Sequence, residues 1–522
     1  KQKNITLNQD TSVDVTETIS VDFADLAKHG LYRFIPVKYS TQLGNNLDIR
    51  FKLISVQDDQ GQSYQVSQSH EGQNIKLKIG DPDQTISGEH SYIISYQVNR
   101  VITEPRDTAE FYWNVTGNGW PVPIASASAT VTVPPGSLLD TICFVGVIGS
   151  STPCTDFSAQ NLQPGEGLTI SVALDKNQFI FPDFLDQAWW FLADNWLYGL
   201  PVLTLAFMLR LYWAKGRDKQ YQNMFDSGGG VETVPLFAEL NVLSAYGPPK
   251  DLTPGEVGAL IDEKVHLQDI TATAIDLARR GFFAIKELPK KGLFGKTDYE
   301  LTNKHQSETG LKDYETEVLS MLFGAGRQDH VKLSKPVTSA YKHLDTAHAK
   351  LYDHLKDQKL FAGNPQAVRT KWIIVAVVIG LSFVFIASPI MLAMGLGAVS
   401  YVAPILSALI ILVFAPFMPA RTAKGRAKLR EVAGLREWIR LGAWREKIHE
   451  KHNFLEEVLP FAIAFGLVDK FITAFSQADF AKLTWYQGAQ GFNSYSFSHS
   501  LNSFSRSLAT GASSTRPRSS SS

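Results

Sequence analysis

The 522-residue chain contains only two cysteines, and its basic and acidic side chains nearly cancel, at 50 and 51. Two cysteines are too few for a disulfide-rich scaffold, and without a basic surplus there is no reason to expect nucleic acid as the main partner. With 44% hydrophobic residues and a net charge of -1, the composition also excludes an intrinsically disordered protein. The length allows roughly two to four folded domains.

The sequence also lacks the motifs of common catalytic and cofactor sites. It has no Walker loop, dinucleotide fingerprint, zinc-protease helix, kinase signature or Gly-x-Ser-x-Gly elbow. The glycine-rich segment 227–230 has no lysine to hold a phosphate. We therefore expect no catalytic residues and no cofactor, and we interpret the protein as non-enzymatic.

Histidines are too widely spaced to predict a metal site. Those considered are His343, His348, His354, His449 and His452. The first three lack the i, i+4 spacing of a helical zinc site, and the last two stand beside Glu456 without a further ligand nearby. We therefore expect surface histidines on amphipathic helices and no bound metal.

Three apolar stretches are long enough to cross a bilayer: Trp189–Trp213, Trp372–Met394 and Val399–Met418. A helix needs about 20 apolar residues to cross a hydrocarbon core of roughly 30 Å. The second and third stretches hold no charged residue, and a short connection between them predicts a tight hairpin. The first has Asp194 near its start and Arg210 near its end. We predict three transmembrane helices over 189–213, 372–394 and 399–418.

Basic residues follow the first stretch, precede the second and follow the third. The three clusters are Arg210, Lys215, Arg217 and Lys219; Arg369 and Lys371; and Arg421, Lys424, Arg426, Lys428 and Arg430. The positive-inside bias puts all three in the cytoplasm. The sequence therefore predicts a multi-pass protein of the cell (cytoplasmic) membrane with residues 1–188 extracytoplasmic and a cytoplasmic C-terminus. Because the sequence opens with Lys1 rather than Met, we expect a cleaved signal peptide or a truncated chain.

The amino-terminal part has the pattern of short strands. Val13, Val15, Ile19, Val21 and Phe23 alternate with polar residues, and similar runs recur between turn signals up to about residue 175. Several short strands at this spacing favour an Ig-like antiparallel β-sandwich over residues 1–182.

Both cysteines, Cys143 and Cys154, lie in this exported part. An oxidising compartment permits a disulfide between them that closes a short loop. The alternative is a pair of unpaired, buried thiols.

Aromatic residues gather in one segment of the same region. Phe111, Tyr112, Trp113 and Trp120 surround Asn114 and suggest a ligand-binding platform for a glycan or a peptide. The alternative is that alternating members fill the sandwich core while the glycines that follow make a hairpin turn.

Four motifs together resemble those of the YciQ-like family, bacterial predicted membrane proteins with a domain of unknown function. They are Gly30–Tyr39 (GLYRFIPVKY), Ala109–Ile124 (AEFYWNVTGNGWPVPI), the helical motifs within Gly247–Ile285, and Glu456–Leu467 (EEVLPFAIAFGL). They occur in the family's order and with its three-span layout. The tail departs from the family, which commonly ends in glycine-rich tracts, whereas this chain ends in serine and phenylalanine.

Residues 214–371 combine helices and strands. Thr253-Pro254 with Glu256 predicts a helix start, a second helix ends at Gly281, and two short strands follow around the loop 289–297. This order favours a winged-helix-like cytoplasmic region, as the resemblance also implies. Balanced charge makes protein docking a better interpretation than DNA binding, since the only basic cluster is Lys290, Lys291 and Lys296.

The predicted organisation is therefore a multidomain membrane protein. Its parts are an exported domain (1–182), the spans 189–213, 372–394 and 399–418, a cytoplasmic winged-helix-like region (214–371), a cytoplasmic helical region (419–483) and a Ser-rich disordered tail (484–522). We expect the lipid bilayer and proteins on both faces as partners, with a homo-oligomer left open and nucleic acid not expected. The function that fits is recognition, scaffolding or signal coupling. The alternatives are a subunit of an envelope transport or polymer-export machine, an envelope enzyme, and a membrane-tethered DNA-binding regulator.

Overall fold

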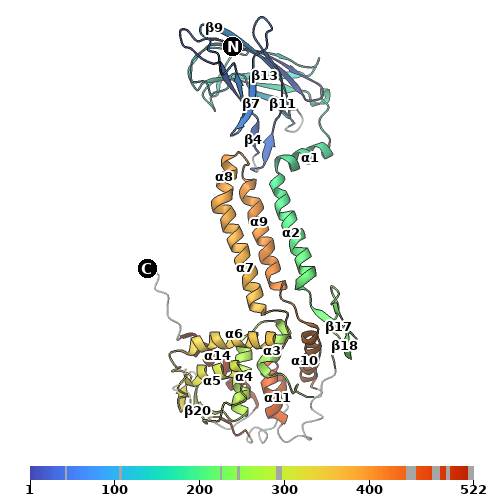
Figure 1. Ribbon diagram of the computed structural model, residues 1–522, viewed down its shortest axis with the longest axis vertical. Coiled ribbons are helices and arrows are strands. Elements are labelled where there is room, and N and C mark those ends of the chain that lie inside the picture. Colours follow the sequence, from blue (N-terminus) through green and yellow to red (C-terminus); the bar gives the residue numbers. More distant parts are fainter. Residues whose placement is uncertain are drawn as a thin grey trace. The chain divides into compact units, whose positions relative to one another are not determined.

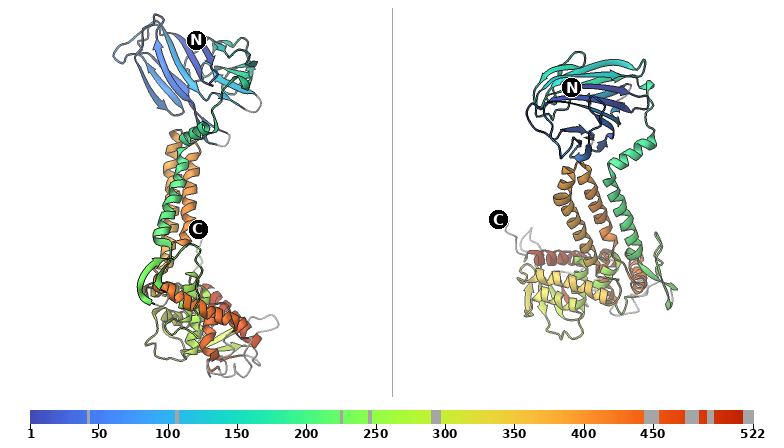
Figure 2. Two further views of the ribbon diagram at one scale, coloured as in Figure 1. Left: turned by 90° about the vertical axis from the view of Figure 1, so that its right-hand side faces the viewer. Right: turned by 45° about the horizontal axis from the view of Figure 1, so that its top comes forward.

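The computed structural model describes residues 1–41, 44–104, 108–223, 226–243, 247–289, 297–442, 454–472, 483–488 and 494–514. The chain divides into two compact units, each discontinuous in sequence. Unit 1 comprises Lys1–Leu205 and Val377–Leu409, and unit 2 comprises Ala206–Ala376 and Ile410–Ser522. Figures 1 and 2 show the helices and strands of both. Each unit has its own hydrophobic core.

The strands of unit 1 form two larger sheets and two small ones. The first sheet has the order β15 (Ser158–Leu162), β12 (Ile124–Thr132), β1 (Gln2–Leu7), β2 (Val13–Asp22), β9 (Glu89–Asn99) and β6 (Arg50–Gln57). The second has the order β10 (Ile102–Thr103), β11 (Ala109–Asn114), β16 (Gly167–Leu174), β13 (Leu138–Gly146) and β14 (Thr152–Pro153). The small sheets are β3 (Leu31–Pro36), β8 (Asn74–Ile79) and β7 (Val66–Glu71), and the hairpin of β4 (Lys38–Ser40) and β5 (Asn46–Asp48).

Period-two alternation explains how these sheets make one core. In β2, Val13 and Val15 are buried and the residues between them are not, and Phe111 and Trp113 of β11 are buried in the same way. The inward-facing residues of both larger sheets belong to a single hydrophobic cluster. The expectation of a wholly antiparallel arrangement is wrong at one pair, because β1 and β12 are parallel.

Three helical segments of the described chain are long and apolar enough to cross a membrane: Trp196–Gly216, Pro365–Ala393 and Val399–Phe417. They are built from η2 (Trp196–Tyr198), α2 (Gly199–Leu211) and η3 (Tyr212–Gly216); from α7 (Pro365–Ser382), η4 (Phe383–Ala387) and α8 (Ser388–Ala393); and from α9 (Val399–Phe414) and η5 (Ala415–Phe417). The first candidate span begins at Trp196 rather than at the predicted Trp189. Residues up to Asp194 form a separate helix, α1 (Phe184–Asp194), which ends where Asn195 leaves helical geometry. The short helix η1 (Lys176–Gln178) precedes α1.

Unit 2 is mainly helical. Its helices are α3 (Pro254–Asp262), α4 (Leu267–Arg279), α5 (Asp313–Phe323), α6 (Ala340–Asp357), α10 (Ala423–Leu441), α11 (Phe454–Ala464), α12 (Val468–Ile472) and α14 (Ser494–Ser514). A four-stranded sheet has the order β21 (His330–Lys332), β20 (Asp298–Asn303), β19 (Phe283–Leu288) and β22 (Tyr486–Gln487), and β17 (Lys219–Asn223) pairs with β18 (Asp226–Thr233). The helix start at Thr253 is observed, with Thr253 and Glu256 forming a capping box.

The carboxyl-terminal segment is more ordered than the composition predicts. The expected disordered tail is wrong over Ser494–Ser514, which forms α14, and β22 adds a strand to the pair β19–β20. Four apolar side chains explain the difference because they recur at helical spacing and are all buried: Phe497, Leu501, Phe504 and Leu508. Serine dominates the composition, but this apolar stripe decides the fold.

Candidate functional site

A carboxylate is completely buried in the core of unit 1 and is surrounded by three cations. The side chain of Glu17 is 0% exposed, and its oxygens lie 2.6 Å from Lys1 Nζ, 3.4 Å from Lys3 Nζ and 3.0 Å from Arg33 Nε. Lys3 lies in β1 and Lys1 directly precedes that strand, whereas Glu17 lies in β2 and Arg33 in β3. We call these four residues the Glu17 cluster. It joins three strands through charge where the surrounding positions are apolar.

The charges of the Glu17 cluster depend on one another. Burial alone would raise the pKa of Glu17, but the three cations, Arg33 foremost, outweigh it and hold that pKa well below its usual range. Burial lowers the pKa of Lys3 to about 8, against the opposing attraction of Glu17. One carboxylate therefore compensates three buried cations, and losing it would leave all three without a counter-charge.

Two of the sequence motifs meet at the Glu17 cluster. Arg33 belongs to the first motif, and its guanidinium lies 5.9 Å from the ring centre of Trp120, in the second motif. Lys1 Nζ lies 4.7 Å from the same ring, and Lys3 Nζ lies 5.5 Å from the ring of Trp113. These are cation–π distances. Segments some 80 residues apart in sequence are thus fixed to each other by the cluster.

The predicted aromatic platform is not formed as a single surface. Phe111 and Trp113 are 0% and 6% exposed and stack on each other in the core, whereas Tyr112 is 59% exposed. Trp120 is half-buried and donates its indole N–H to the Thr116 carbonyl. Asn114 donates to the side chain of Asn118. Phe111 and Trp113 therefore fill the core, as the alternative expects, and Tyr112 is the strongly exposed member of these aromatics. The hairpin that the alternative also expects is not formed, because β11 and β12 belong to different sheets.

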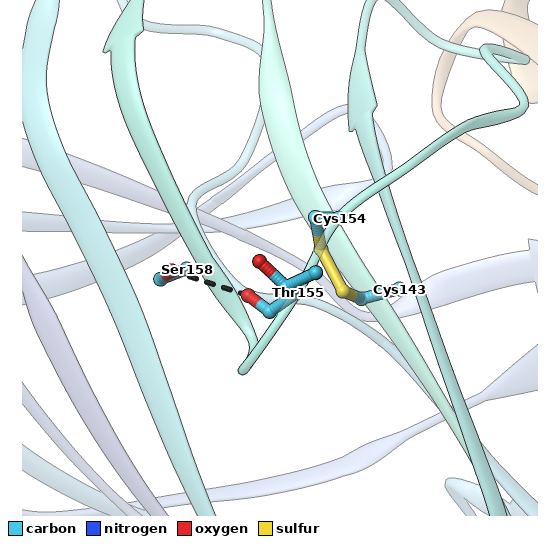
Figure 3. Close-up of a disulfide and its surroundings, with 4 residues drawn as sticks. All are labelled: Cys143, Cys154, Thr155 and Ser158. Atoms are coloured by element: carbon cyan, nitrogen blue, oxygen red, sulfur yellow. Dashed lines mark hydrogen bonds between the residues drawn. A yellow bond between two sulfur atoms is a disulfide. The ribbon is translucent and has the colours of Figure 1, made fainter.

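A disulfide joins Cys143 of β13 to Cys154, with the two Cα atoms 5.3 Å apart (Figure 3). The backbone N–H of Cys154 also donates to the Cys143 carbonyl, and the Ser158 hydroxyl donates to the Thr155 carbonyl beside it. The bond closes a loop at the edge of the five-stranded sheet, where β13 and β14 pair.

Removing this bond should destabilise unit 1 by a predictable amount. The double variant Cys143→Ser/Cys154→Ser is expected to lose about 2–3 kcal/mol of unfolding free energy, since a short loop is then free in the unfolded chain. Denaturant unfolding of the purified full chain, with and without a reductant, checks this. A reductant should weaken the wild type and leave the double variant unchanged; equal sensitivity of the two would contradict it.

The carboxyl end of α1 is held by a buried ionic junction within unit 1. Asp194, 6% exposed, accepts from Arg50 Nη2 at 2.7 Å and also pairs with Arg100. Asn46 donates its side-chain amide to the Leu396 carbonyl at 2.8 Å, in the turn between α8 and α9. We call these five residues the Asp194 junction. It ties strands of the β region both to the start of the first span and to the turn between the other two.

Arginines of the second and third basic clusters share carboxylates in unit 2, and one of these carboxylates follows the first span. Arg421 pairs with Asp218 at 3.3 Å and with Glu263 at 2.6 Å, and Arg369 pairs with Glu263 at 3.3 Å. Arg426 lies 3.5 Å from Asp218. We call these five residues the Arg421 network. It links the segments that follow the first and third spans to the beginning of the second.

Arg421 is the centre of this network. Its guanidinium donates to the carbonyls of Leu260 and Ile261 at 2.8–3.1 Å, at the carboxyl end of α3. The last carbonyls of a helix have no partner within the helix, so this arginine caps α3. Burial raises the pKa of Glu263 despite the attraction of Arg421. The network thus fixes a helix end and two carboxylates at once.

Two of the histidines considered in the sequence pair with separate carboxylates. His354 lies 2.7 Å from buried Glu256, while His343 lies 2.7 Å from a different carboxylate, that of Glu317. No group of three or more histidine, cysteine, aspartate or glutamate side chains is placed to hold a metal among the residues that the structure describes. Two earlier candidate groups lie outside the described residues: His449 with His452, and Lys290, Lys291 and Lys296.

The Glu17 cluster and the Asp194 junction were missed in the sequence. The sequence did contain a signal for the Glu17 cluster. Buried and exposed positions alternate along β1 and β2, and Lys3 and Glu17 stand at buried positions, where apolar residues are expected. A charge at such a position predicts a partner inside the core. Asp194 carried no such signal, because it stands among aromatic residues that resemble a membrane interface.

Comparison with known proteins gives the family. Residues 2–174 match the N-terminal domain, and residues 244–475 the C-terminal domain, of the family described as predicted membrane protein (DUF2207). The uncharacterized protein YciQ of Escherichia coli (strain K12) is 29% identical over 121 residues, which is 23% of this chain and 19% of that protein. The matched stretch therefore spans about a fifth of YciQ. Both domain matches occur in order, as the four motifs suggested, and the chain belongs to the YciQ-like DUF2207 family of membrane proteins.

Proposed function

We propose that this protein couples recognition outside the cell membrane to protein partners in the cytoplasm, without catalysing a reaction. Residues 1–188 form an extracytoplasmic recognition domain of the Ig-like sandwich type, and residues 214–371 with 419–483 form the cytoplasmic docking part. Within that part, α3, α4, β19 and β20 make a winged-helix-like unit. Proteins on both faces are the partners.

The Asp194 junction is the observation that carries this proposal. Arg50 and Arg100 of the β region hold Asp194 at the start of the first span, and Asn46 reaches the Leu396 carbonyl between the other two spans. A Cβ at Gly397 would lie 2.1 Å from the Asn46 side-chain oxygen, so the turn must approach closely. A displacement of the β region is therefore passed to the first span through the Asp194 ion pairs and to the turn between the other two through a neutral hydrogen bond.

Two further observations support the orientation. The Arg421 network joins the segments next to all three spans, as expected when they share the cytoplasmic side. The bond between Cys143 and Cys154 suits an oxidising compartment for residues 1–188.

The burial of α4 argues against the alternative of a DNA-binding regulator. In a winged-helix protein the second helix reads DNA and must present one face to the groove. Every residue from Asp269 to Ala278 in α4 is buried. Helices α3, α5, α11 and α14 all contact α4 and cover it. A helix covered in this way fits protein docking through other faces of the unit.

A protease-accessibility map with crosslinking tests the proposal. In intact cells, added protease should cut within 1–188 and leave 214–371 intact, while inside-out vesicles should give the opposite pattern. Crosslinking and mass spectrometry of the native membrane complex should then find different partners on the two parts. Cleavage of both parts from the same face would contradict the orientation, and crosslinks confined to one part would contradict the coupling.

A further inference from the structure

A cavity of about 270 Å³ opens in unit 2 where the first and third spans end. Its lining includes Tyr212 near the end of the first span, Arg217 and Asp218 just after it, Phe417 at the end of the third, and Phe237, Glu263 and Arg426. A Cβ at Gly216 would lie 3.0 Å from the Phe417 carbonyl oxygen, so the two span ends approach as closely as their backbones allow. The cavity therefore lies at the level where a bilayer's headgroups would meet these spans.

The charge around the cavity is unbalanced. The lining holds Arg217 and Arg426 together with two carboxylates, Asp218 and Glu263. The surplus comes from Arg369, Arg421 and Arg430, which lie close to these groups without lining the cavity. Arg217 and Arg430 donate to Val234 and Gln220 rather than to a carboxylate in the described contacts. Arg421 and Arg430 are each 8% exposed. Because arginine keeps its proton in proteins, such a surplus cannot be relieved by neutralising a side chain. A bound anion would compensate this surplus of positive charge.

Unused hydrogen-bond donors point to the same place. The Nε atoms of Arg369, Arg426 and Arg430 are buried and have no hydrogen-bond partner among the described residues. A buried donor left without an acceptor costs free energy, and a guanidinium fork matches the oxygens of a phosphate. Arg426 is the one of the three that lines the cavity. Desolvation and the nearby arginines lower its pKa, as expected for a cation that lacks full compensation.

The rim of the cavity is apolar and exposed. Phe237 is 101% exposed, Phe417 59% and Leu236 46%. Large exposed apolar side chains next to a span end are typical of residues that contact lipid. The volume is also below the roughly 300–1,000 Å³ of pockets that enclose a whole small molecule. A charged group that enters while its acyl chains remain in the bilayer fits these features.

We propose that this cavity binds the phosphate group of an anionic phospholipid, with Arg426 as its principal cationic contact. Arg217 contributes positive charge from the end of the first span, and Phe237 and Phe417 contact the lipid next to the headgroup. This inference rests on the proposed placement of the spans in a bilayer. A bound anionic lipid would fix the ends of two spans relative to α10.

Native mass spectrometry of the purified full chain tests this, with dioleoylphosphatidylglycerol or dioleoylphosphatidylcholine added to the detergent solution. Wild type should retain the anionic lipid preferentially. Arg426→Gln should weaken that binding about tenfold, the effect of losing one charge-assisted contact. Arg436→Gln, an exposed arginine of the same helix, is the matched control and should bind like wild type. An equal loss in both variants would overturn the proposal.

Two further measurements keep the result interpretable. Phe237 is fully exposed, so Phe237→Ala should keep the fold and weaken lipid binding only. The unfolding temperature measured with and without inorganic phosphate separates the two sources of the anion. An increase that depends on Arg426 would assign the site to free phosphate. No increase with phosphate, together with lipid binding in native mass spectrometry, would assign the site to the lipid headgroup. The absence of any Arg426-dependent binding of either would overturn the site. The protease map reports on membrane placement independently, so the two failures are distinguishable.

Discussion

Replacing Glu17 by glutamine is expected to destabilise unit 1 by about 3–5 kcal/mol, the cost of removing one partner from a buried ionic group. The variant leaves Lys1, Lys3 and Arg33 close together in the core with no counter-charge. Because Arg33 and Lys1 also contact Trp120, the second motif should loosen with them. Denaturant unfolding of the full chain, followed by tryptophan fluorescence and by protease resistance of residues 1–182, measures the loss.

Two variants separate charge balance from a general effect of substitution. Glu89→Gln removes the same charge from an exposed position on the neighbouring strand β9 and should behave like wild type. Lys3→Met removes one of the three cations while Glu17 keeps Lys1 and Arg33, and a buried ion replaced by an apolar chain of similar size is often neutral or stabilising. Lys3→Met should therefore be at least as stable as wild type. A loss equal to that of Glu17→Gln would contradict the charge-balance explanation.

Arg421→Gln is expected to have the largest effect in unit 2, again about 3–5 kcal/mol of unfolding free energy. The substitution leaves the carbonyls at the end of α3 uncapped and deprives Asp218 and Glu263 of their shared partner. The helices that pack on α3 should lose protection together. Hydrogen exchange of the full chain should show faster exchange in α3 and α4 than in wild type.

Arg421→Lys tests whether the geometry of the guanidinium matters as well as its charge. Lysine keeps the charge but cannot donate to two carbonyls and two carboxylates in a fixed plane. It should recover only part of the stability lost in Arg421→Gln. The control is Arg440→Gln, at an exposed position of α10 that pairs with Glu437. Full recovery by lysine would show that the charge alone holds this site.

Local patterns in the sequence predicted much of the architecture. Long apolar runs identified all three candidate spans, because about 20 apolar residues in a row match the thickness of a bilayer's hydrocarbon core. Alternation identified the strands of unit 1, and Thr253 with Glu256 marked the start of α3. Each of these signals depends only on neighbours within one or two turns of the chain, so it can be read without knowing the fold.

The features that were missed depend on distant partners. Glu17 meets Arg33 across two strands, and Asp194 meets Arg50 over an interval of 144 residues. Neither contact follows from local periodicity. The aromatic segment was ambiguous for a related reason. Which face of β11 meets the core decides that Phe111 and Trp113 are buried and that Tyr112 is exposed, and the sequence of the strand does not fix that face. Sequence composition likewise hid the four apolar residues of α14 among serines.

The order of synthesis gives the last strand of unit 2 a particular significance. Strand β22 pairs with β19, and Tyr299 donates its hydroxyl proton to the Ser500 carbonyl across 201 residues. Both apolar helices of the hairpin are made between these partners, so a ribosome must deliver the hairpin to the insertion machinery before the sheet can close. The sheet can therefore be completed only after the hairpin has been synthesised, and a chain that stalls before β22 leaves the β19 edge of the sheet unpaired.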